Sequence, residues 1–355
     1  MNSNASPYMR IAGRRIGRDY PPYIIAEMSA NHNGSLDKAF RLIETARAAG
    51  ADAVKLQTYR GDTITLDSDR PEFQITSGLW AGTSLYQLYE SAYTPWEWHK
   101  PLFDKARAEG ITIFSSPFDT TAVDLLEDLN APAYKIASFE AIDLPLIRYS
   151  ARTGKPMIIS TGMASAEEIA EAIDAARSGG CEEVAVLRCV SGYPAPATDY
   201  HLRTMSDMMS RFGVVTGLSD HTLDNVTAVC SVALGAALIE KHFTLDRNGG
   251  GPDDSFSLEP ADLAALVRDA RTAWDALGGV NYARKSSEQG NAQFRRSLYA
   301  VKPIAAGELF TNENVRSIRP GFGLAPKHLD RLLGRPSPVS FERGEPITDV
   351  ALSAS

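Results

Sequence analysis

The stretch YIIAEMSANHNGSLDKAFRLIETARAAGADAVKLQ, residues 23–57, contains a complete strand–helix–strand unit and decides the predicted fold of most of the chain. Its two ends, YIIAE and AVKLQ, are short apolar runs of the kind that form buried parallel strands. Between them, Ser35 can cap a segment with helical spacing that stops before Gly50. This order of elements is typical of a parallel sheet.

The same alternation of apolar runs and helical segments continues to about residue 277. The eight predicted strands are YIIAE at 23–27, AVKLQ at 53–57, ITIFSS at 111–116, AYKIAS at 133–138, MIISTG at 157–162, VAVLRCVS at 184–191, VVTGLSD at 214–220 and LIEKHF at 238–243. Ser165 and Glu168 form a capping box before another helix. Eight such units that close on themselves predict an α/β fold, a TIM (β/α)8 barrel.

A chain of 355 residues predicts two domains, because single hydrophobic cores stop growing at roughly 250 to 300 residues. We predict a barrel domain over residues 1–280 and a linker over 281–294, where Gly, Asn, Ser and charged residues replace the periodic apolar pattern. Residues 295–355 alternate strand-like pieces with Gly and Asn turns, which predicts a small β-rich domain.

Composition excludes several classes of protein. The chain is 44% hydrophobic and 23% charged with a formal net charge of −8, which is ordinary for a globular protein and argues against a general nucleic-acid binder. It has neither the apolar core of a secretion signal nor a run of about 18 apolar residues, so we expect a cytoplasmic protein without a membrane span. Cys181, Cys189 and Cys230 lack CxxC spacing, and we expect all three to be small buried apolar residues.

Polar side chains gather at the carboxyl ends of the predicted strands, where TIM barrels place their catalytic groups. They are Glu27, Lys55, Gln57, Ser116, Lys135, Ser138, Ser160, Ser219, His221, Glu240 and His242. One polar residue at a strand end is ordinary, because the chain surfaces there. Two lysines, two histidines and two glutamates within apolar strands would be costly unless they pair or hold a ligand, so the set predicts an active site.

His221 and His242 end adjacent predicted strands, so their imidazoles could reach one metal ion. A lone histidine is more often structural, but a pair at one mouth favours a metal. With two histidine ligands and no nearby thiolate, the other positions would go to oxygen donors, water or substrate. That set favours an open, exchangeable Mn, Mg, Co or Zn ion over a closed structural zinc.

Lys55 and Lys135 supply two positive charges to the same mouth, with serine hydroxyls beside them. This combination predicts a site for a small polyanion. A Schiff-base aldolase would also place a lysine inside a barrel, and the histidine pair argues against that alternative. Glu27 is the candidate for proton transfer or for binding sugar hydroxyls, and the NHNG turn at 31–34 is either part of this rim or a helix-capping turn.

Residues 59–95 are too many for a simple crossover loop and contain ITSGLWAGTSLYQLYESAY. A long insertion at the mouth of a barrel could serve as a substrate lid or wall. A surface subdomain or a dimer contact is the alternative. In and just after this stretch, the aromatic residues that could form an apolar wall are Trp80, Tyr86, Tyr89, Trp96 and Trp98, although such residues are more often ordinary core.

Eight motifs form one recognisable set: IAEMSANHNGS, DAVKLQTY, FSSPFD, YKIASFE, ISTGM, GLSDHT, EKHFTLDR and RPGFGL. Together they resemble the N-acetylneuraminate (sialic acid) synthase family over nearly the whole chain. Within the family, LWAGTSLYQLYESAYTPWEWHKPLF and CVSGYPAP resemble the pseudaminic acid branch more than the N-acetylneuraminate branch.

The resemblance implies a TIM barrel followed by an antifreeze-like (SAF) domain, in a homodimer in which each tail domain closes the active site of the partner. It implies metal binding by His221 and His242, with Mn²⁺ favoured and Mg²⁺ or Co²⁺ possible, and a catalytic set of Glu27 and these two histidines. The implied phosphoenolpyruvate ligands are Lys55, Ser116, Lys135, Ser138, Ser160 and Ser219. The implied sugar ligands are Glu27, Gln57, Tyr193, Asp253 and, from the tail of the partner, Arg319.

Two positions depart from the N-acetylneuraminate branch: Ser191 replaces an Asn and Ser116 a Thr. The implied activity is condensation of phosphoenolpyruvate with 2,4-diacetamido-2,4,6-trideoxy-L-altrose and water, which gives a nine-carbon sugar acid and phosphate by carbon–oxygen cleavage. The alternatives are a sister enzyme that makes N-acetylneuraminate or legionaminate, a Schiff-base aldolase, and a non-catalytic sugar- or ice-binding protein suggested by the tail.

Overall fold

A computed structural model describes residues 6–353 and separates the chain into two compact units between Gly278 and Gly279. Each unit is described by itself. The predicted linker (281–294) and tail domain (295–355) both lie within the second unit.

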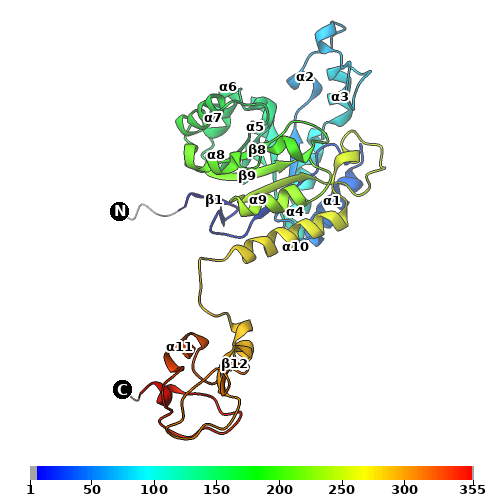
Figure 1. Cartoon of the computed structure of the whole chain (residues 1–355). Coiled ribbons are helices and arrows are strands. Elements are labelled where there is room, and N and C mark those ends of the chain that lie inside the picture. The colour runs from blue at the N-terminus through cyan, green and yellow to red at the C-terminus, as the bar shows by residue number, and fades with distance from the viewer. Residues whose placement is uncertain (1–5, 354–355) are drawn as a thin grey trace. The chain divides into compact units, whose positions relative to one another are not determined.

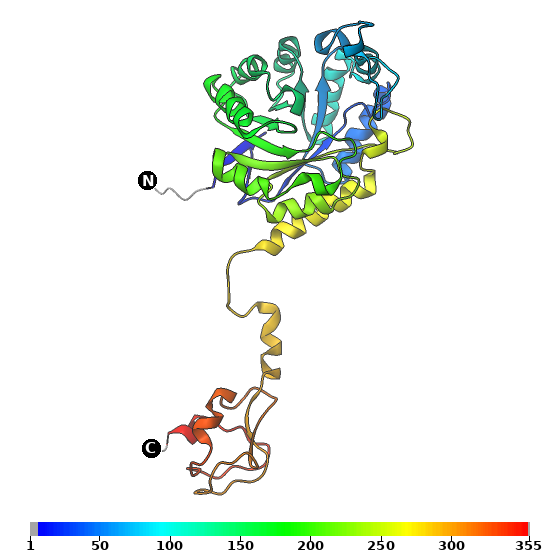
Figure 2. The ribbon, with the colours of Figure 1, turned by 45° about the horizontal axis from the view of Figure 1, so that its top comes forward.

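The first unit is a closed barrel of eight parallel strands, as predicted (Figures 1 and 2). The strands, in barrel order, are β3 (Tyr23–Glu27), β4 (Ala53–Thr58), β5 (Thr112–Pro117), β6 (Tyr134–Ile136), β7 (Met157–Ser160), β8 (Val184–Cys189), β9 (Val215–Asp220) and β10 (Leu238–His242). The surrounding helices are α1 (Leu36–Ala48), α4 (Trp96–Glu109), α5 (Thr120–Asp128), α6 (Leu144–Ala151), α7 (Ala166–Ser178), α8 (Thr204–Phe212), α9 (Val226–Ala233) and α10 (Pro260–Leu277).

Local capping signals define helix starts as expected. Ser35 accepts a hydrogen bond from the backbone N–H of Lys38 at the start of α1. Ser165 and Glu168 form the predicted capping box at the start of α7. The main departure lies in β6, which is shorter than predicted because Ser138 already begins the 3-10 turn η2 (Ser138–Glu140).

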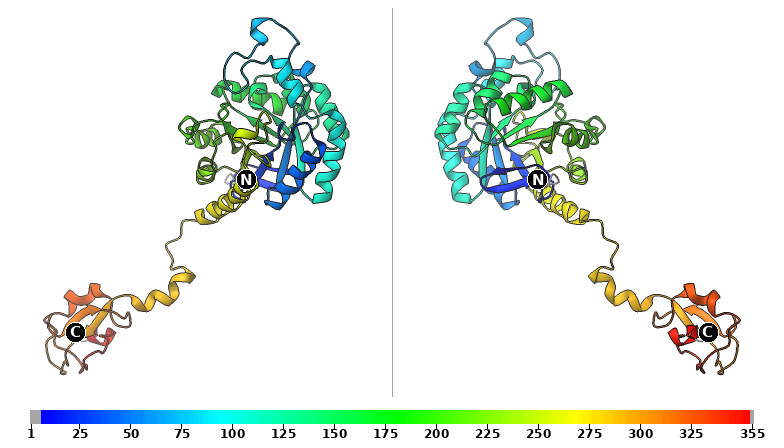
Figure 3. Two further views of the ribbon diagram at one scale, coloured as in Figure 1. Left: turned by 90° about the vertical axis from the view of Figure 1, so that its right-hand side faces the viewer. Right: turned by 90° about the vertical axis from the view of Figure 1, so that its left-hand side faces the viewer.

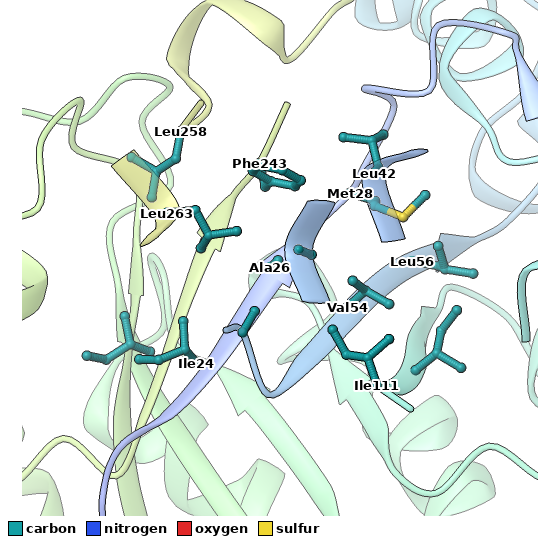
Figure 4. Close-up of a cluster of buried hydrophobic side chains, with 14 of the residues drawn as sticks. Ile24, Ala26, Met28, Leu42, Val54, Leu56, Ile111, Phe243, Leu258 and Leu263 are labelled. Atoms are coloured by element: carbon teal, nitrogen blue, oxygen red, sulfur yellow. The ribbon is translucent and has the colours of Figure 1, made fainter. Parts of the chain in front are cut away.

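Side chains alternate across the barrel wall, since successive residues of a strand point to opposite faces. Outward-facing residues such as Ile24, Ala26 and Val54 pack against α1 and α10, as Figure 4 shows with Leu42 and Leu263. This outer apolar layer holds the helices on the barrel and leaves the inward positions for the site.

An antiparallel hairpin, β1 (Tyr8–Ile11) and β2 (Arg14–Gly17), closes the amino end of the barrel. Its Met9, Ile11 and Ile16 are completely buried in one cluster with the inward residues Tyr23 and Phe114. The sequence analysis did not predict this hairpin. It forms an apolar floor beneath the polar residues.

The insertion between β4 and α4 contains α2 (Gly61–Ile64), η1 (Pro71–Phe73) and α3 (Leu85–Ala92). Figure 3 shows it at the end of the barrel opposite the β1–β2 hairpin, which is the carboxyl end of the strands. Two short 3-10 helices of the other loops are η3 (Ala197–Tyr200) and η4 (Asp254–Phe256).

The second unit begins with a 3-10 helix, η5 (Ser286–Phe294), within the stretch predicted as linker. A two-stranded antiparallel sheet of β11 (Ser297–Ala300) and β12 (Val315–Ile318) follows, with η6 (Pro326–His328), α11 (Leu329–Leu332) and η7 (Asp349–Leu352). Its small core includes Leu298, Phe310 and Ile347.

Two further expectations concern the cysteines and the membrane. Cys181 and Cys189 are buried as expected, whereas the expectation for Cys230 was wrong, because this residue lies on α9 and is exposed. None of the helices within residues 6–353 is both long and apolar enough to cross a bilayer.

Candidate active site at the carboxyl end of the barrel

The strand register places the predicted residues on one inner ring. Glu27 lies opposite Lys55 on β4 and opposite His242 on β10, and Gln57 lies opposite Ser116 on β5. All of these face inward above the apolar floor. The structure therefore brings together side chains that are far apart in the sequence.

Four charged side chains form a buried network across the ring. Lys55 Nζ lies 2.6 Å from Glu27 Oε2 and 3.6 Å from Glu240 Oε1. Lys135 Nζ lies 3.3 Å from the same Glu240 oxygen, so Glu240 bridges both lysines. No member of the network is more than 5% exposed. The charges balance, two positive and two negative, which is how a barrel can bury them.

Burial and pairing act on the pKa of each member differently. Burial raises the pKa of Glu27, against the opposing charge of Lys55, and burial lowers the pKa of Lys135. Burial alone would raise the pKa of Glu240, but the two lysines outweigh it and the net shift is downward. Glu240 therefore stays ionised, and Glu27 is the carboxyl group that can take up a proton more readily.

Serine hydroxyls line the wall beside the lysines. Ser116 Oγ accepts a hydrogen bond from Lys55 Nζ at 3.1 Å, and Ser138 Oγ accepts one from the Gly162 backbone N–H at 3.1 Å. The buried hydroxyls of Ser160 and Ser191 have no hydrogen-bond partner among the described residues. A Cβ added to Gly162 would collide with the hydroxyls of Ser191 and Ser138. The hydroxyls of Ser138, Ser160 and Ser191 thus lie at the carboxyl ends of three neighbouring strands, β6, β7 and β8.

Ser219, which is 3% exposed, lies on β9, opposite Cys189 of β8 and opposite Glu240 of β10. The thiol of Cys189 is 2% exposed, and burial raises its pKa. Sequence reasoning gave Cys189 no place in the site. Its inward alternation within β8, two residues after Leu187, is the signal that could have found it.

The two histidines are adjacent, as predicted, with ring centroids 5.4 Å apart and planes inclined at 68°. The Nδ1–H group of His221 donates to the Val190 carbonyl at 2.8 Å, which leaves Nε2 as the acceptor nitrogen. Burial lowers the pKa of His221 to about 4 and that of His242 well below its usual range. Both imidazoles are therefore neutral near pH 7, as metal binding requires.

The donor set fits an open metal site. The Nδ1 atom of His242 is buried without a hydrogen-bond partner in the described part of the chain, and the nearest acid, Asp253 Oδ2, is 3.8 Å away. Across residues 6–353, no group of three or more His, Cys, Asp and Glu side chains is placed to hold a metal. A cation held by these histidines would take its other ligands from water or substrate.

A hydrogen-bonded chain joins the predicted sugar ligands. Gln57 Nε2 donates to Glu27 Oε1 and to Ser29 Oγ, at 3.1 Å in each case, and Ser29 Oγ donates to Asp253 Oδ2. Burial raises the pKa of Asp253. Ser29 is a linking residue that the sequence analysis missed.

Tyr193 completes this side of the site. Its ring lies 4.3 Å from the His221 ring, 5.3 Å from Phe256 and 6.0 Å from Trp80, measured between centroids. Trp80 Nε1 donates to the Pro252 carbonyl at 3.1 Å, which ties the insertion to the loop that carries Asp253. The insertion therefore forms a wall of the site through Trp80.

The other aromatic residues that were considered for this wall have different surroundings from Trp80. Trp98 packs against the outer core and edge-on against His32, which is the ordinary core role that the sequence offered as the alternative. Trp96 donates to the Tyr59 carbonyl at 3.1 Å, and Tyr89 packs edge-on against Tyr59. Tyr86 of α3 is partly buried.

The NHNG turn has mainly a structural role. Asn31 Nδ2 donates to the Phe243 carbonyl and to Ser257 Oγ, and Asn33 Nδ2 donates to Asp254. These bonds hold the loops after β3 and β10 together. Arg319 belongs to the second unit, where it is exposed directly after β12; its role in the site of a partner stays a prediction.

Comparisons with known proteins agree with this geometry. The model of the NeuB family matches residues 42–282, and that of the SAF domain matches residues 295–353. Pseudaminic acid synthase of Campylobacter jejuni is 44% identical over 93% of this chain and 96% of its own length. N,N'-diacetyllegionaminic acid synthase of the same species is 36% identical, over 92% of this chain and 98% of its own length.

Among solved structures, the N-acetylneuraminic acid (sialic acid) synthetase of Leptospira borgpetersenii in complex with citrate superimposes with a TM-score of 0.72 at 30% identity. The match covers 82% of this chain and 96% of that one.

Proposed function

This chain belongs to the NeuB family, and on that premise we propose that it is a pseudaminic acid synthase. It is a transferase that condenses phosphoenolpyruvate with 2,4-diacetamido-2,4,6-trideoxy-L-altrose and water, and releases phosphate. The observation that carries the proposal is the pair of buried lysines next to two neutral histidines, together with the hydroxyls of Ser160 and Ser191, which have no hydrogen-bond partner within residues 6–353. A polyanion and an aldehyde can thus be held side by side.

Phosphoenolpyruvate occupies the lysine side in this proposal. Lys55 and Lys135 neutralise its phosphate and carboxylate, and charge-assisted bonds from both ammonium groups orient it. Hydroxyl groups come from Ser116, Ser138, Ser160 and Ser219. The hydroxyl of Ser160 has no hydrogen-bond partner among the described residues and is thus free to bind the substrate. Binding replaces part of the attraction that Glu240 exerts on both lysines.

The acceptor sugar occupies the histidine side, against Tyr193 and the Gln57–Ser29–Asp253 chain. His221 and His242 would hold a divalent cation, for which Mn²⁺ is proposed, with Mg²⁺ or Co²⁺ as alternatives. When bound there, such a cation would supply Lewis-acid polarisation of the aldehyde oxygen. The protein side chains orient the aldehyde carbon toward C3 of phosphoenolpyruvate and exclude bulk water.

In the reaction, the C3–aldehyde carbon bond forms, water adds at C2, and the C2–oxygen bond to phosphate breaks. One proton ends on the new hydroxyl group, and another leaves the attacking water. Glu27 is the group proposed to handle one of these protons. Burial raises its pKa and favours the protonated form, whereas Lys55 Nζ, 2.6 Å from its Oε2, favours the carboxylate.

The choice of acceptor rests on the apolar character of the wall and on the higher identity to the pseudaminic acid enzyme. The trideoxy sugar carries a methyl group and a second acetamido group, and Trp80, Tyr193 and Phe256 offer aromatic surface for them. The alternative is a sister enzyme that makes N-acetylneuraminate or legionaminate by the same chemistry.

Phosphate release from phosphoenolpyruvate with Mn²⁺ present tests this choice. Release with the diacetamido-trideoxy-altrose, and not with N-acetylmannosamine, is expected. Release with N-acetylmannosamine alone would move the chain to the N-acetylneuraminate branch. Borohydride should trap no lysine adduct, because no Schiff base forms.

We also propose a homodimer in which the SAF domain of one copy covers the site of the other. Exposed apolar side chains on the mouth loops, Phe139 and Met163, support it, together with Phe322 in the tail motif. Co-expressed Arg319→Ala and Lys135→Ala subunits should regain activity as heterodimers, and confirmed heterodimers without activity would refute the exchange. The cytoplasm, which supplies phosphoenolpyruvate, is the proposed compartment.

A further inference from the structure

A charged pair is buried in the outer wall of the barrel, behind the two histidines. Lys241 of β10 and Asp220 of β9 lie directly opposite each other in the strand register. Lys241 Nζ is 2.9 Å from Asp220 Oδ2, and the side chains are 2% and 0% exposed. Outward-facing positions on other strands of the barrel are apolar, such as Ile24, Ala26 and Val54.

Fold stability alone does not account for such a pair. Removing two charges from water is costly, and replacing a buried ion pair by uncharged residues of similar size is often neutral or stabilising. We therefore consider how the pair affects the geometry of the strands that carry it, β9 and β10.

The two charged residues are the immediate neighbours of the two histidines in the sequence. Asp220 directly precedes His221, and Lys241 directly precedes His242, so each charged residue points outward while its neighbour points into the site. The ion pair thus fixes the ends of β9 and β10 relative to each other at the level from which both imidazoles project.

The same ammonium group also holds the loop after His221. Lys241 Nζ donates to the carbonyl of Thr222 at 2.8 Å and to that of Asp224 at 2.6 Å. Asp220 Oδ1 accepts the Thr222 backbone N–H at 2.9 Å. The backbone on the carboxyl side of His221 is thereby fastened to the residue that precedes His242.

We propose that Lys241 and Asp220 are positioning residues that set the separation and orientation of the His221 and His242 imidazoles for metal binding. The inference rests on the proposed function in using these histidines as the ligands. Both side chains lie on the outer face of the barrel, so they would contact neither metal nor substrate. The pair acts through the backbone of Thr222 and Asp224, and not through a direct hydrogen bond to either imidazole.

The test is the double variant Asp220→Asn/Lys241→Met, which removes both charges and keeps side chains of similar size. Its matched control, Lys100→Met/Asp104→Asn, removes an exposed pair from α4, in which the side chains are 74% and 48% exposed. Binding of MnCl₂ to each full-length protein is titrated by electron paramagnetic resonance without substrates. Hydrogen exchange of residues 220–224 is followed by mass spectrometry without metal, and unfolding midpoints are measured in parallel.

We expect about 10- to 100-fold weaker Mn²⁺ binding in the double variant and faster amide exchange confined to 220–224, with an unfolding midpoint near that of the wild type. The control should match the wild type in all three measurements. A double variant that binds Mn²⁺ within twofold of the wild type, or whose exchange is unchanged, overturns the proposal. If the wild type itself binds no Mn²⁺, the metal site of the proposed function fails, and the exchange measurement still decides the role of the pair.

Discussion

Replacing Glu240 by Gln should destabilise the barrel more than the loss of any exposed charge, because Glu240 is the carboxylate shared by both buried lysines. The substitution keeps the volume of the side chain. It leaves Lys55, Lys135 and Glu27 with a net charge of +1 in a network that was neutral.

The distances set the magnitude. Charges at 3.3 and 3.6 Å attract each other by about 5 kcal/mol each at an effective dielectric constant of about 20. Part of this is offset, because the cost of burying the carboxylate disappears with it. Breaking one partner of a buried pair costs about 3 to 5 kcal/mol in practice. At about 2 °C per kcal/mol for a domain of this size, the melting temperature should fall by about 6 to 10 °C.

Scanning calorimetry in a phosphate-free buffer measures the shift. Glu72→Gln, which removes an exposed partner of Arg70, is the matched control and should change stability by less than about 1 kcal/mol. Added inorganic phosphate should raise the melting temperature of Glu240→Gln more than that of the wild type, since an anion can then neutralise the excess charge. A melting temperature of Glu240→Gln within 2 °C of the wild type, roughly 1 kcal/mol, would refute the reasoning.

Three further predictions concern the site and its surroundings. Glu27→Gln should lower kcat by about 10²- to 10⁴-fold with a normal circular dichroism spectrum, and near-normal turnover would remove Glu27 from proton transfer. Gly162→Ala should raise the KM for phosphoenolpyruvate more than the KM for the sugar, because the added Cβ collides with two serine hydroxyls of the lysine side; equal effects in steady-state kinetics would contradict this. Burial lowers the pKa of His99 in the folded protein from 6.5 to about 4. As the pH falls, His99 is therefore protonated in the unfolded chain before it is protonated in the folded one. The stability that is present above pH 6.5 is lost as the pH falls toward 4. The loss is roughly 3 kcal/mol, and urea midpoints of His99→Gln should decline less over this range than those of the wild type.

Much of the site could be predicted because strand-end position is a local property. Lys55, His221 and His242 were identified as residues of one mouth from their places at the ends of apolar runs. The register places Lys55 and His242 on either side of Glu27, and the centroid of the His221 ring lies 5.4 Å from that of His242. The sequence left the place of Trp98 open, since a helix with aromatic residues at that spacing can present them either to a pocket or to the core, and only packing against His32 and the outer core decides between the two.

Other features depend on contacts between residues distant in the sequence. The β1–β2 hairpin is too short for a clear periodic pattern, and its burial depends on a barrel floor that exists only after the strands close. The bridge from Glu240 to Lys135 spans 105 residues of sequence. Its place within an apolar run marked Glu240 as a residue of the mouth, but nothing local identifies the two lysines as its partners.

The sequence by itself determined the order of eight strands and helices, the helix caps and the chemical types at each strand end, because these follow from alternation and spacing along the chain. Only the tertiary structure decided which of those side chains meet. Closure of the barrel set Glu240 between two lysines and Lys241 behind two histidines, and the energies of buried charges depend on such distances and not on sequence position.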